Sequence, residues 1–167
     1  MRNKPALPSD FEEWRNYLQA FPARARPALH PNFHEILSAS FSVGSWDERT
    51  DAIVTVYREF PDKRFNSGIA DANGLLARQI MLNGQDDEIL VKDYIVDPAP
   101  VETFLEFLTP ISIPLFTPVT DVVFDGGTFG LRVSASGIQI FTSDPAPSDT
   151  VQSVISRTRK LLTDLSL

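Results

Sequence analysis

The sequence predicts an α+β fold: one domain built on an antiparallel β-sheet of hairpins, with N-terminal, middle and C-terminal helices packed on it. Three observations predict this class. Helix-like and strand-like patterns follow one another in the order helix, strands, helix, strands, helix. Tight turns rather than helical crossovers join the strands, which favours antiparallel pairing. The 167 residues suit a single domain, 1–167, and no repeat or linker divides them.

The first 35 residues form a proline-rich region with one predicted helix, Asp10–Phe21. Ser9 and Glu12 have the spacing of a capping box, which marks the start of a helix. An apolar stripe follows at spacings of three and four, made of Phe11, Trp14, Leu18 and Phe21. The stretch after this helix is irregular, with one helical turn expected after Pro31.

Four strands are predicted next. Apolar and serine residues alternate over Ser38–Val43, and Ala52–Phe60 is rich in β-branched and aromatic residues. Leu75–Leu82 and Glu88–Val96 flank the turn dipeptide Asn83-Gly84, which predicts a hairpin whose loop is longer than two residues. Leu75–Leu82 also fits a short helix.

The second half of the chain contains the remaining elements, each delimited by proline, glycine or a capping residue. In chain order these are a helix over Val101–Leu108, an apolar connector or edge strand before Pro118, a hairpin of Val122–Phe124 and Thr128–Ser134 around Asp125-Gly126-Gly127, a strand over Ile138–Ser143, and a closing amphipathic helix over Asp149–Leu165.

Composition excludes several classes of function. The absence of cysteine excludes disulfides, thiolate metal sites and cysteine nucleophiles. No apolar run has the length of a transmembrane helix, and the N-terminus lacks the apolar core of a signal peptide, so a cytoplasmic location is expected. The net charge of −7 argues against nucleic acid and anionic membranes as partners.

The negative charge is concentrated in one segment. Residues 86–125 hold nine acidic residues against Lys92, while the rest of the chain is close to neutral. Two interpretations remain open: a solvated acidic face, or a docking surface for a basic partner. The candidate partner-binding residues are Asp86, Asp87, Glu88, Asp93, Asp97 and, as an exposed aromatic anchor in the loop GSWDERTD between two predicted strands, Trp46.

No motif for catalysis or for a cofactor is present, so the sequence predicts neither catalytic residues nor a bound cofactor. His30 and His34 have a spacing that could present two metal ligands, but Pro31 lies between them and only Glu35 is a nearby acid. We therefore interpret them as surface or cap histidines, and no metal site is predicted. Asp86-Asp87-Glu88 is too compact for paired acid–base catalysis and lacks the spacing of a calcium loop.

The run IPLFTPVTDVVFDGGTFGLRVSASGIQIFTS with the helix after it resembles a layout found in bacterial immunity-type proteins. The resemblance covers residues 100–165. It consists of a helix, an Ile-x-Ile-Pro connector, a strand, a glycine turn, a hairpin and a closing helix. Such proteins neutralise polymorphic or contact-dependent toxins by binding them in the cytoplasm.

These observations predict a non-enzymatic binding protein, a monomer or homodimer, whose acidic residues occlude a basic toxin domain. The first alternative is a chaperone or adaptor for a secreted effector, which would bind an extended segment of its client. The second alternative is a small enzyme that uses Asp and Glu chemistry, which would need two converging carboxylates in a pocket.

Overall fold

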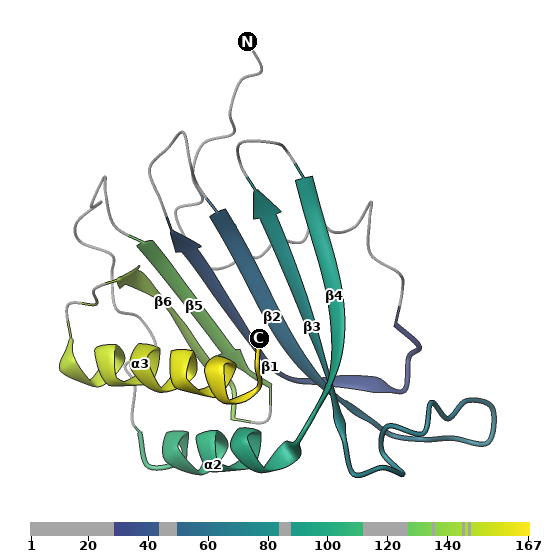
Figure 1. Ribbon diagram of the computed structural model, residues 1–167. Helices are drawn as coiled ribbons and strands as arrows, with labels where there is room; N and C mark the ends of the chain where they lie inside the picture. The colour runs from purple at the N-terminus through teal and green to yellow at the C-terminus, as the bar shows by residue number, and fades with distance from the viewer. Residues whose placement is uncertain are drawn as a thin grey trace.

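Six strands form one antiparallel sheet in the computed structural model, in the order β4-β3-β2-β1-β5-β6 (Figure 1). The structure describes residues 29–43, 50–83, 88–111, 127–134, 136–144, 146 and 148–167. The elements are β1 Phe33–Val43, β2 Thr50–Glu59, β3 Leu75–Asn83, β4 Glu88–Val96, α2 Pro98–Leu108, β5 Gly127–Val133, β6 Ile138–Asp144 and α3 Asp149–Asp164.

The first four strands form a meander, and the chain then crosses the sheet. Strands β1 to β4 pair with their sequence neighbours, so β4 becomes one edge of the sheet. Helix α2 follows β4 and runs beneath the sheet (Figure 1). Strand β5 then pairs with β1 on the other side, and β6 forms the second edge. Among the described strands, none pairs with the outer side of β4, the first strand of the acidic segment.

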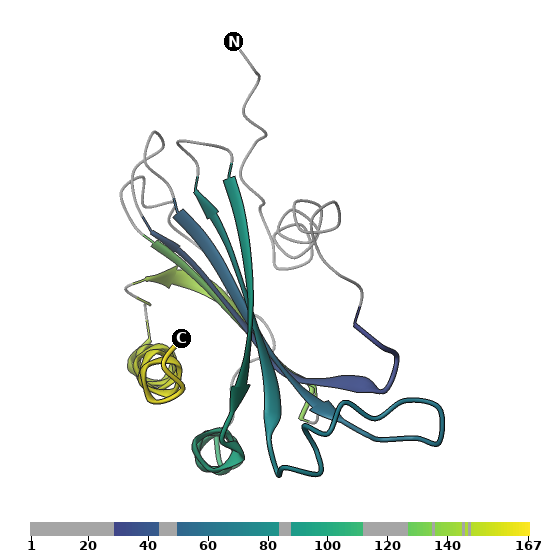
Figure 2. The same ribbon diagram turned by 45° about the vertical axis from the view of Figure 1, so that its right-hand side comes forward.

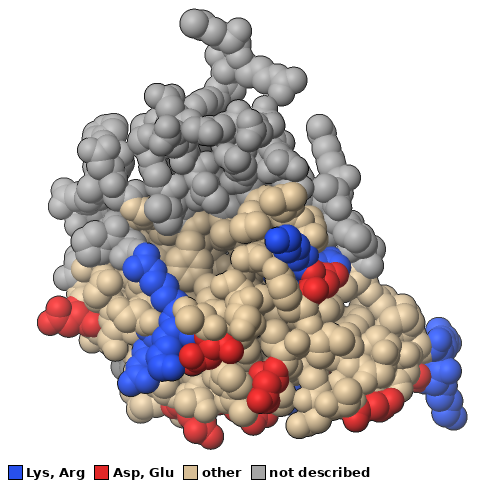
Figure 3. Space-filling view, viewed as in Figure 1, with Lys and Arg blue, Asp and Glu red and all other residues tan. Residues whose placement is uncertain are grey.

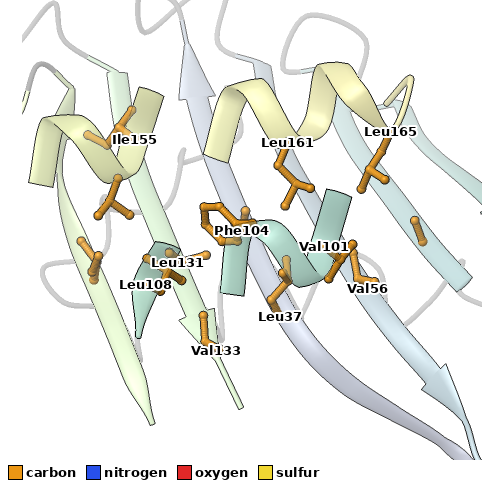
Figure 4. Packing of buried hydrophobic residues seen from close by; sticks show 14 of the residues in the cluster. Leu37, Val56, Val101, Phe104, Leu108, Leu131, Val133, Ile155, Leu161 and Leu165 are labelled. Atoms are coloured by element: carbon orange, nitrogen blue, oxygen red, sulfur yellow. The ribbon is translucent and has the colours of Figure 1, made fainter. Parts of the chain in front are cut away.

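Both described helices lie on the same face of the sheet, as the turned view shows (Figure 2). The predicted stripe of the C-terminal helix explains this for α3, because Val154, Ile155 and Leu161 on it are buried. They pack with Phe104 and Leu108 of α2 in the hydrophobic core (Figure 4). Alternate residues of the strands form the side of this core that the sheet contributes. The core residues of the strands are Leu37, Ala39, Val56, Leu75, Ala77, Val96, Phe129, Leu131, Val133 and Ile140.

The prediction of three helices packed on the sheet is wrong. In the described part of the chain, the structure is mostly a six-stranded antiparallel sheet, with one short middle helix and one C-terminal helix. The amphipathic stripe of Asp10–Phe21 indicates an apolar side, but such a stripe does not specify the surface against which that side packs. That segment lies outside the described residues.

One further prediction needed correction at the level of a single element. Strand β1 begins at Phe33, where a helical turn was expected, and a bulge between Glu35 and Leu37 interrupts the alternation that would have revealed the longer strand. Helix α3 begins at Asp149, as predicted, with Ser148 as its N-cap, and Gln152 accepts a hydrogen bond from the Ala146 backbone N–H at 2.7 Å.

Some predictions lie outside the described residues or are met in part. Leu75–Leu82 is strand and not helix, and it pairs with β4 as a hairpin. The predicted connector after Ile111 and the strand Val122–Phe124 lie outside the described residues.

Among the helices that the structure does describe, none is both long and apolar enough to cross a membrane.

Candidate functional site

The structure places three of the six predicted partner-binding residues. Asp86, Asp87 and Trp46 lie outside the described residues. Glu88 is the first residue of β4, Asp93 lies within this strand, and Asp97 directly follows it. The described part of the predicted site therefore follows the edge strand and its junction with α2.

Asp93 binds an arginine on the neighbouring strand. In the β3–β4 register Asp93 lies opposite Arg78, whose Nε and Nη2 donate to the two carboxylate oxygens at 2.7 Å each. The arginine is only 2% exposed, whereas the Asp93 side chain is 41% exposed. The carboxylate raises the pKa of Arg78, which keeps the buried guanidinium charged. Asp93 therefore has a structural role that its charge alone did not reveal.

The ion pair belongs to a row of polar residues that crosses all six strands. Directly opposed positions along this row are Asp93, Arg78, Thr55, Ser38, Arg132 and Gln139. Leu37, Ala39, Val56, Ala77, Leu131 and Val133, which are sequence neighbours of residues in this row, lie in the core beneath the helices, so the row faces the opposite side of the sheet. The row is internally bonded: Ser38 and Thr55 share a hydrogen bond of 3.1 Å, and Arg132 Nε donates to Glu35 at 2.9 Å.

Asp97 is the N-cap of α2. Its carboxylate accepts a hydrogen bond from the Ala99 backbone N–H at 3.0 Å, and its backbone is extended, as an N-cap requires. Glu102 and Glu106 lie one turn apart on the exposed side of this helix. Glu102 has one cationic neighbour, Arg58, at 3.8 Å between Nη2 and Oε1. Because both glutamates are exposed and loosely held, they are free to meet another molecule.

Exposed apolar side chains accompany these acids. The large hydrophobic residues that are exposed in the described chain are Ile95 at 69%, Phe60 at 54% and Leu90 at 41%. Ile95 and Leu90 both belong to β4 and point to opposite sides of the sheet. We call the exposed residues of this strand and helix the β4–α2 surface: Leu90, Lys92, Asp93, Ile95, Asp97, Glu102 and Glu106.

On the side of the molecule that carries the helices, Figure 3 shows both acidic and basic side chains among the described residues, with most of the described surface uncharged. The basic residues of α3, among them Arg157 and Lys160, contribute to this mixture. The acidic excess of the described chain therefore lies along β4 and α2, where Lys92 is the sole basic residue between Glu88 and Ile111.

A second cluster, which the sequence did not predict, organises the loop between β2 and β3. Glu59, at the end of β2, is 2% exposed and accepts four hydrogen bonds. They come from Ser67 N and Ser67 Oγ at 2.6 Å each, from Ala70 N at 3.2 Å and from Asn32 Nδ2 at 3.4 Å. Both carboxylate oxygens are thus engaged, and Glu59 holds the loop 60–74 against the end of the sheet.

The loop itself is ordered by local hydrogen bonds. Asp62 accepts from the backbone N–H groups of Arg64 and Phe65 at 2.7 and 2.8 Å, and these bonds lower the pKa of Asp62. The Phe65 ring stacks on His30 with 4.0 Å between ring centroids. The loop is therefore a built structure, although no element of regular secondary structure lies within it.

Burial alone would raise the pKa of Glu59, but the hydrogen bonds from Ser67, Ala70 and Asn32 outweigh this effect and lower it below 4.5. Its contribution to stability is therefore present above the unfolded pKa and is lost as the pH falls through the lower folded pKa. Glu59→Gln should lower the free energy of unfolding near neutral pH by about 2 kcal/mol, since one acceptor oxygen becomes a donor facing other donors.

Denaturant unfolding of both proteins between neutral pH and about pH 2 measures this effect. The difference between wild type and Glu59→Gln should shrink below pH 4.5. The exposed Glu102→Gln is the control and should match wild type throughout. A pH-independent difference would contradict the assigned role of the carboxylate.

The two histidines have structural contacts. His30 Nδ1 lies 2.7 Å from Asn32 Oδ1, in addition to the stacking on Phe65. His34 meets Phe60 edge to face, with 5.0 Å between ring centroids. Within the described ranges, no group of three or more histidine and acidic residues is arranged to hold a metal ion.

The carboxylates of Glu59 and Asp93 are bound on both oxygens, and Glu35 is engaged by Arg132. On the β4–α2 surface, Glu102, Glu106, Leu90 and Ile95 are exposed to solvent. No protein-family model, no curated protein and no solved structure matches the chain.

Proposed function

We propose that this protein is a non-enzymatic cytoplasmic binding protein that neutralises a bacterial toxin, as an immunity protein does, by occluding a basic domain of that toxin. The observation that supports this proposal is the β4–α2 surface, in which exposed acids accompany two exposed hydrophobic residues on an edge strand. Partner surfaces combine these features: apolar contacts supply affinity, and charges at the rim steer association.

The described positions refine the roles of the predicted residues. Asp93 is held by Arg78 and Asp97 caps α2, so both contribute to the electrostatic field from fixed positions. Glu102 and Glu106 have the freedom to form ion pairs with lysine or arginine of a partner. Leu90 and Ile95 supply the apolar contact area.

The partner is found by affinity capture from the source cell with the wild-type protein as bait. A captured protein counts as a cognate toxin only if its expression alone arrests bacterial growth and co-expression of this chain restores growth. A secreted effector that is not toxic, and whose stability depends on this chain, would instead establish the chaperone function.

Charge reversal then tests the surface on the purified pair. Glu102→Lys with Glu106→Lys should slow association by about tenfold at low ionic strength and weaken its dependence on salt, because steering by the acidic field is lost. Stopped-flow or biosensor kinetics measure this. The matched control is Asp149→Lys with Asp164→Lys, which makes the same change of charge on α3 and should alter the rate by less than about threefold. Equal effects of the two double variants would refute the assigned surface.

A further inference from the structure

Strand β4 is an edge of the sheet in the described part of the chain. It pairs with β3 from Glu88 to Val96, and no described strand pairs with its other side. Alternate backbone N–H and C=O groups of such a strand point outward and offer a template for an added strand. Natural edge strands are commonly protected by short length, proline, a bulge or charged side chains. Strand β4 has nine residues, contains no proline and shows no break in its register, and its charged residues are Glu88, Lys92 and Asp93.

The side chains along this edge define the sequence pattern that an added strand would need. On the side of the polar row the edge presents Val91, Asp93 and Ile95. On the helical side it presents Leu90, Lys92 and Tyr94, and Tyr94 donates a hydrogen bond to Gln79 at 3.2 Å. On each side of the sheet, an added strand would therefore lie beside an apolar residue, then a charged residue, then an apolar or aromatic residue.

The charge around the edge selects among possible occupants. Strand β4 carries Glu88, Asp93 and Lys92, and the adjoining helix α2 with its cap adds the acids Asp97, Glu102 and Glu106 and no basic residue. A second copy of this chain would bring a second acidic segment to the same place, and like charges close together are unfavourable. A segment with basic residues has the complementary charge.

We propose that β4 binds its partner by strand addition: an extended segment of the partner, mainly apolar and with a basic residue opposite Asp93, pairs antiparallel with this edge and extends the six described strands to seven. The proposal rests on the protein-binding function above and specifies the binding mode. Antiparallel pairing continues the pattern of the sheet, and its hydrogen bonds are better aligned than parallel ones. The backbone supplies affinity, and Leu90 and Ile95 supply contacts on the two sides.

A synthetic peptide tests this mode without the natural partner. The probe is acetyl-Lys-Ile-Val-Lys-Thr-Val-Leu-Lys-amide, written to place Ile opposite Ile95, Lys opposite Asp93 and Val opposite Val91. Titration into ¹⁵N-labelled full-length protein should shift the backbone amide signals of β4 more than those of β6, the other edge. Absence of binding, or binding at β6 or at the helices, would overturn the proposal.

Backbone methylation provides the decisive comparison. In an added strand, alternate peptide N–H groups point toward β4 and the others point to solvent. Two isomeric probes are therefore made, each N-methylated on alternate residues but in opposite frames. Strand addition predicts that one frame weakens binding at least tenfold and the other leaves it within about threefold. Docking through side chains alone predicts that both frames behave alike.

Variants of the protein complete the test. Leu90→Lys and Ile95→Lys place a positive charge on the edge and should each weaken the probe at least fivefold. Phe60→Lys changes an equally exposed hydrophobic residue outside the edge and should not alter binding. If the cognate toxin is neutralised but the two methylated frames behave alike, the binding mode is wrong while the proposed function stands. If the probe binds in one frame but the captured partner is not a toxin, the function is wrong while the edge site stands.

Discussion

Asp93→Ala is expected to destabilise the protein by about 3 kcal/mol, because it removes the carboxylate that neutralises a buried guanidinium. Arg78 is 2% exposed and donates two hydrogen bonds of 2.7 Å to Asp93. Removal of one partner of a buried ion pair costs more than the pair is worth, since the remaining charge stays in a poorly solvated position. Solvent at the half-exposed Asp93 side limits the loss, which keeps the expected value at the lower end of the range for buried pairs.

Equilibrium urea unfolding, monitored by circular dichroism, gives the free energy of unfolding. Asp97→Ala is the matched control, because it also removes an acid from the β4–α2 surface but costs only the cap of α2, about 1 kcal/mol. The double variant Arg78→Met with Asp93→Leu should be more stable than Asp93→Ala, since it leaves no buried guanidinium that has lost its carboxylate. Equal losses for Asp93→Ala and Asp97→Ala would show that the ion pair contributes little.

Phe129→Ala is expected to have the largest effect of any single substitution considered, a loss of about 4 kcal/mol. Phe129 lies on β5, has no exposed surface and packs against Phe41 of β1 with 5.3 Å between ring centroids. Its removal leaves a cavity where β1, β5 and the helical layer meet, in addition to the lost transfer free energy of the ring.

The same unfolding assay measures this effect as a lower midpoint at an unchanged denaturant dependence. Phe60→Ala is the control, because that ring is 54% exposed and its truncation should cost less than about 1 kcal/mol. A cost for Phe129→Ala below 2 kcal/mol would mean that the core relaxes around the missing ring, or that its packing differs from the one described.

Local patterns predicted most of the strands and the two described helices, and the errors have identifiable causes. The alternation of Ser38–Val43 revealed only the second half of β1, because the bulge after Glu35 hides the period of the first half. The stripe of α3 correctly marked its buried side, since helical spacing and burial coincide there. The same reasoning applied to Asp10–Phe21 led to a third packed helix, because a stripe carries no information about its docking surface.

The site was predicted less well, although part of it was within reach. The hairpin of Leu75–Leu82 with Glu88–Val96 was predicted, and the register that the structure shows, with Asn83 opposite Glu88, places Arg78 opposite Asp93. The prediction left the register open, so Asp93 looked like a free docking charge. The Glu59 cluster was not predictable in this way, because Asn32 and Glu59 are 27 residues apart and come together only in the folded sheet.

The position of β5 beside β1 has a consequence for how the chain acquires its fold. Strands β1 to β4 pair in sequence order, so they can form through short-range hairpins, whereas Glu35 and Arg132 are separated by 97 residues. Closing a loop of that length costs entropy before its contacts repay it, so the docking of β5 should be the slow step of folding. During synthesis, strands β1 to β4 can form the meander before α3 has been made. The apolar face of these strands, which includes Leu37 and Val56, is then not yet covered by α3. The interval before that helix arrives is when the nascent chain is most prone to aggregation.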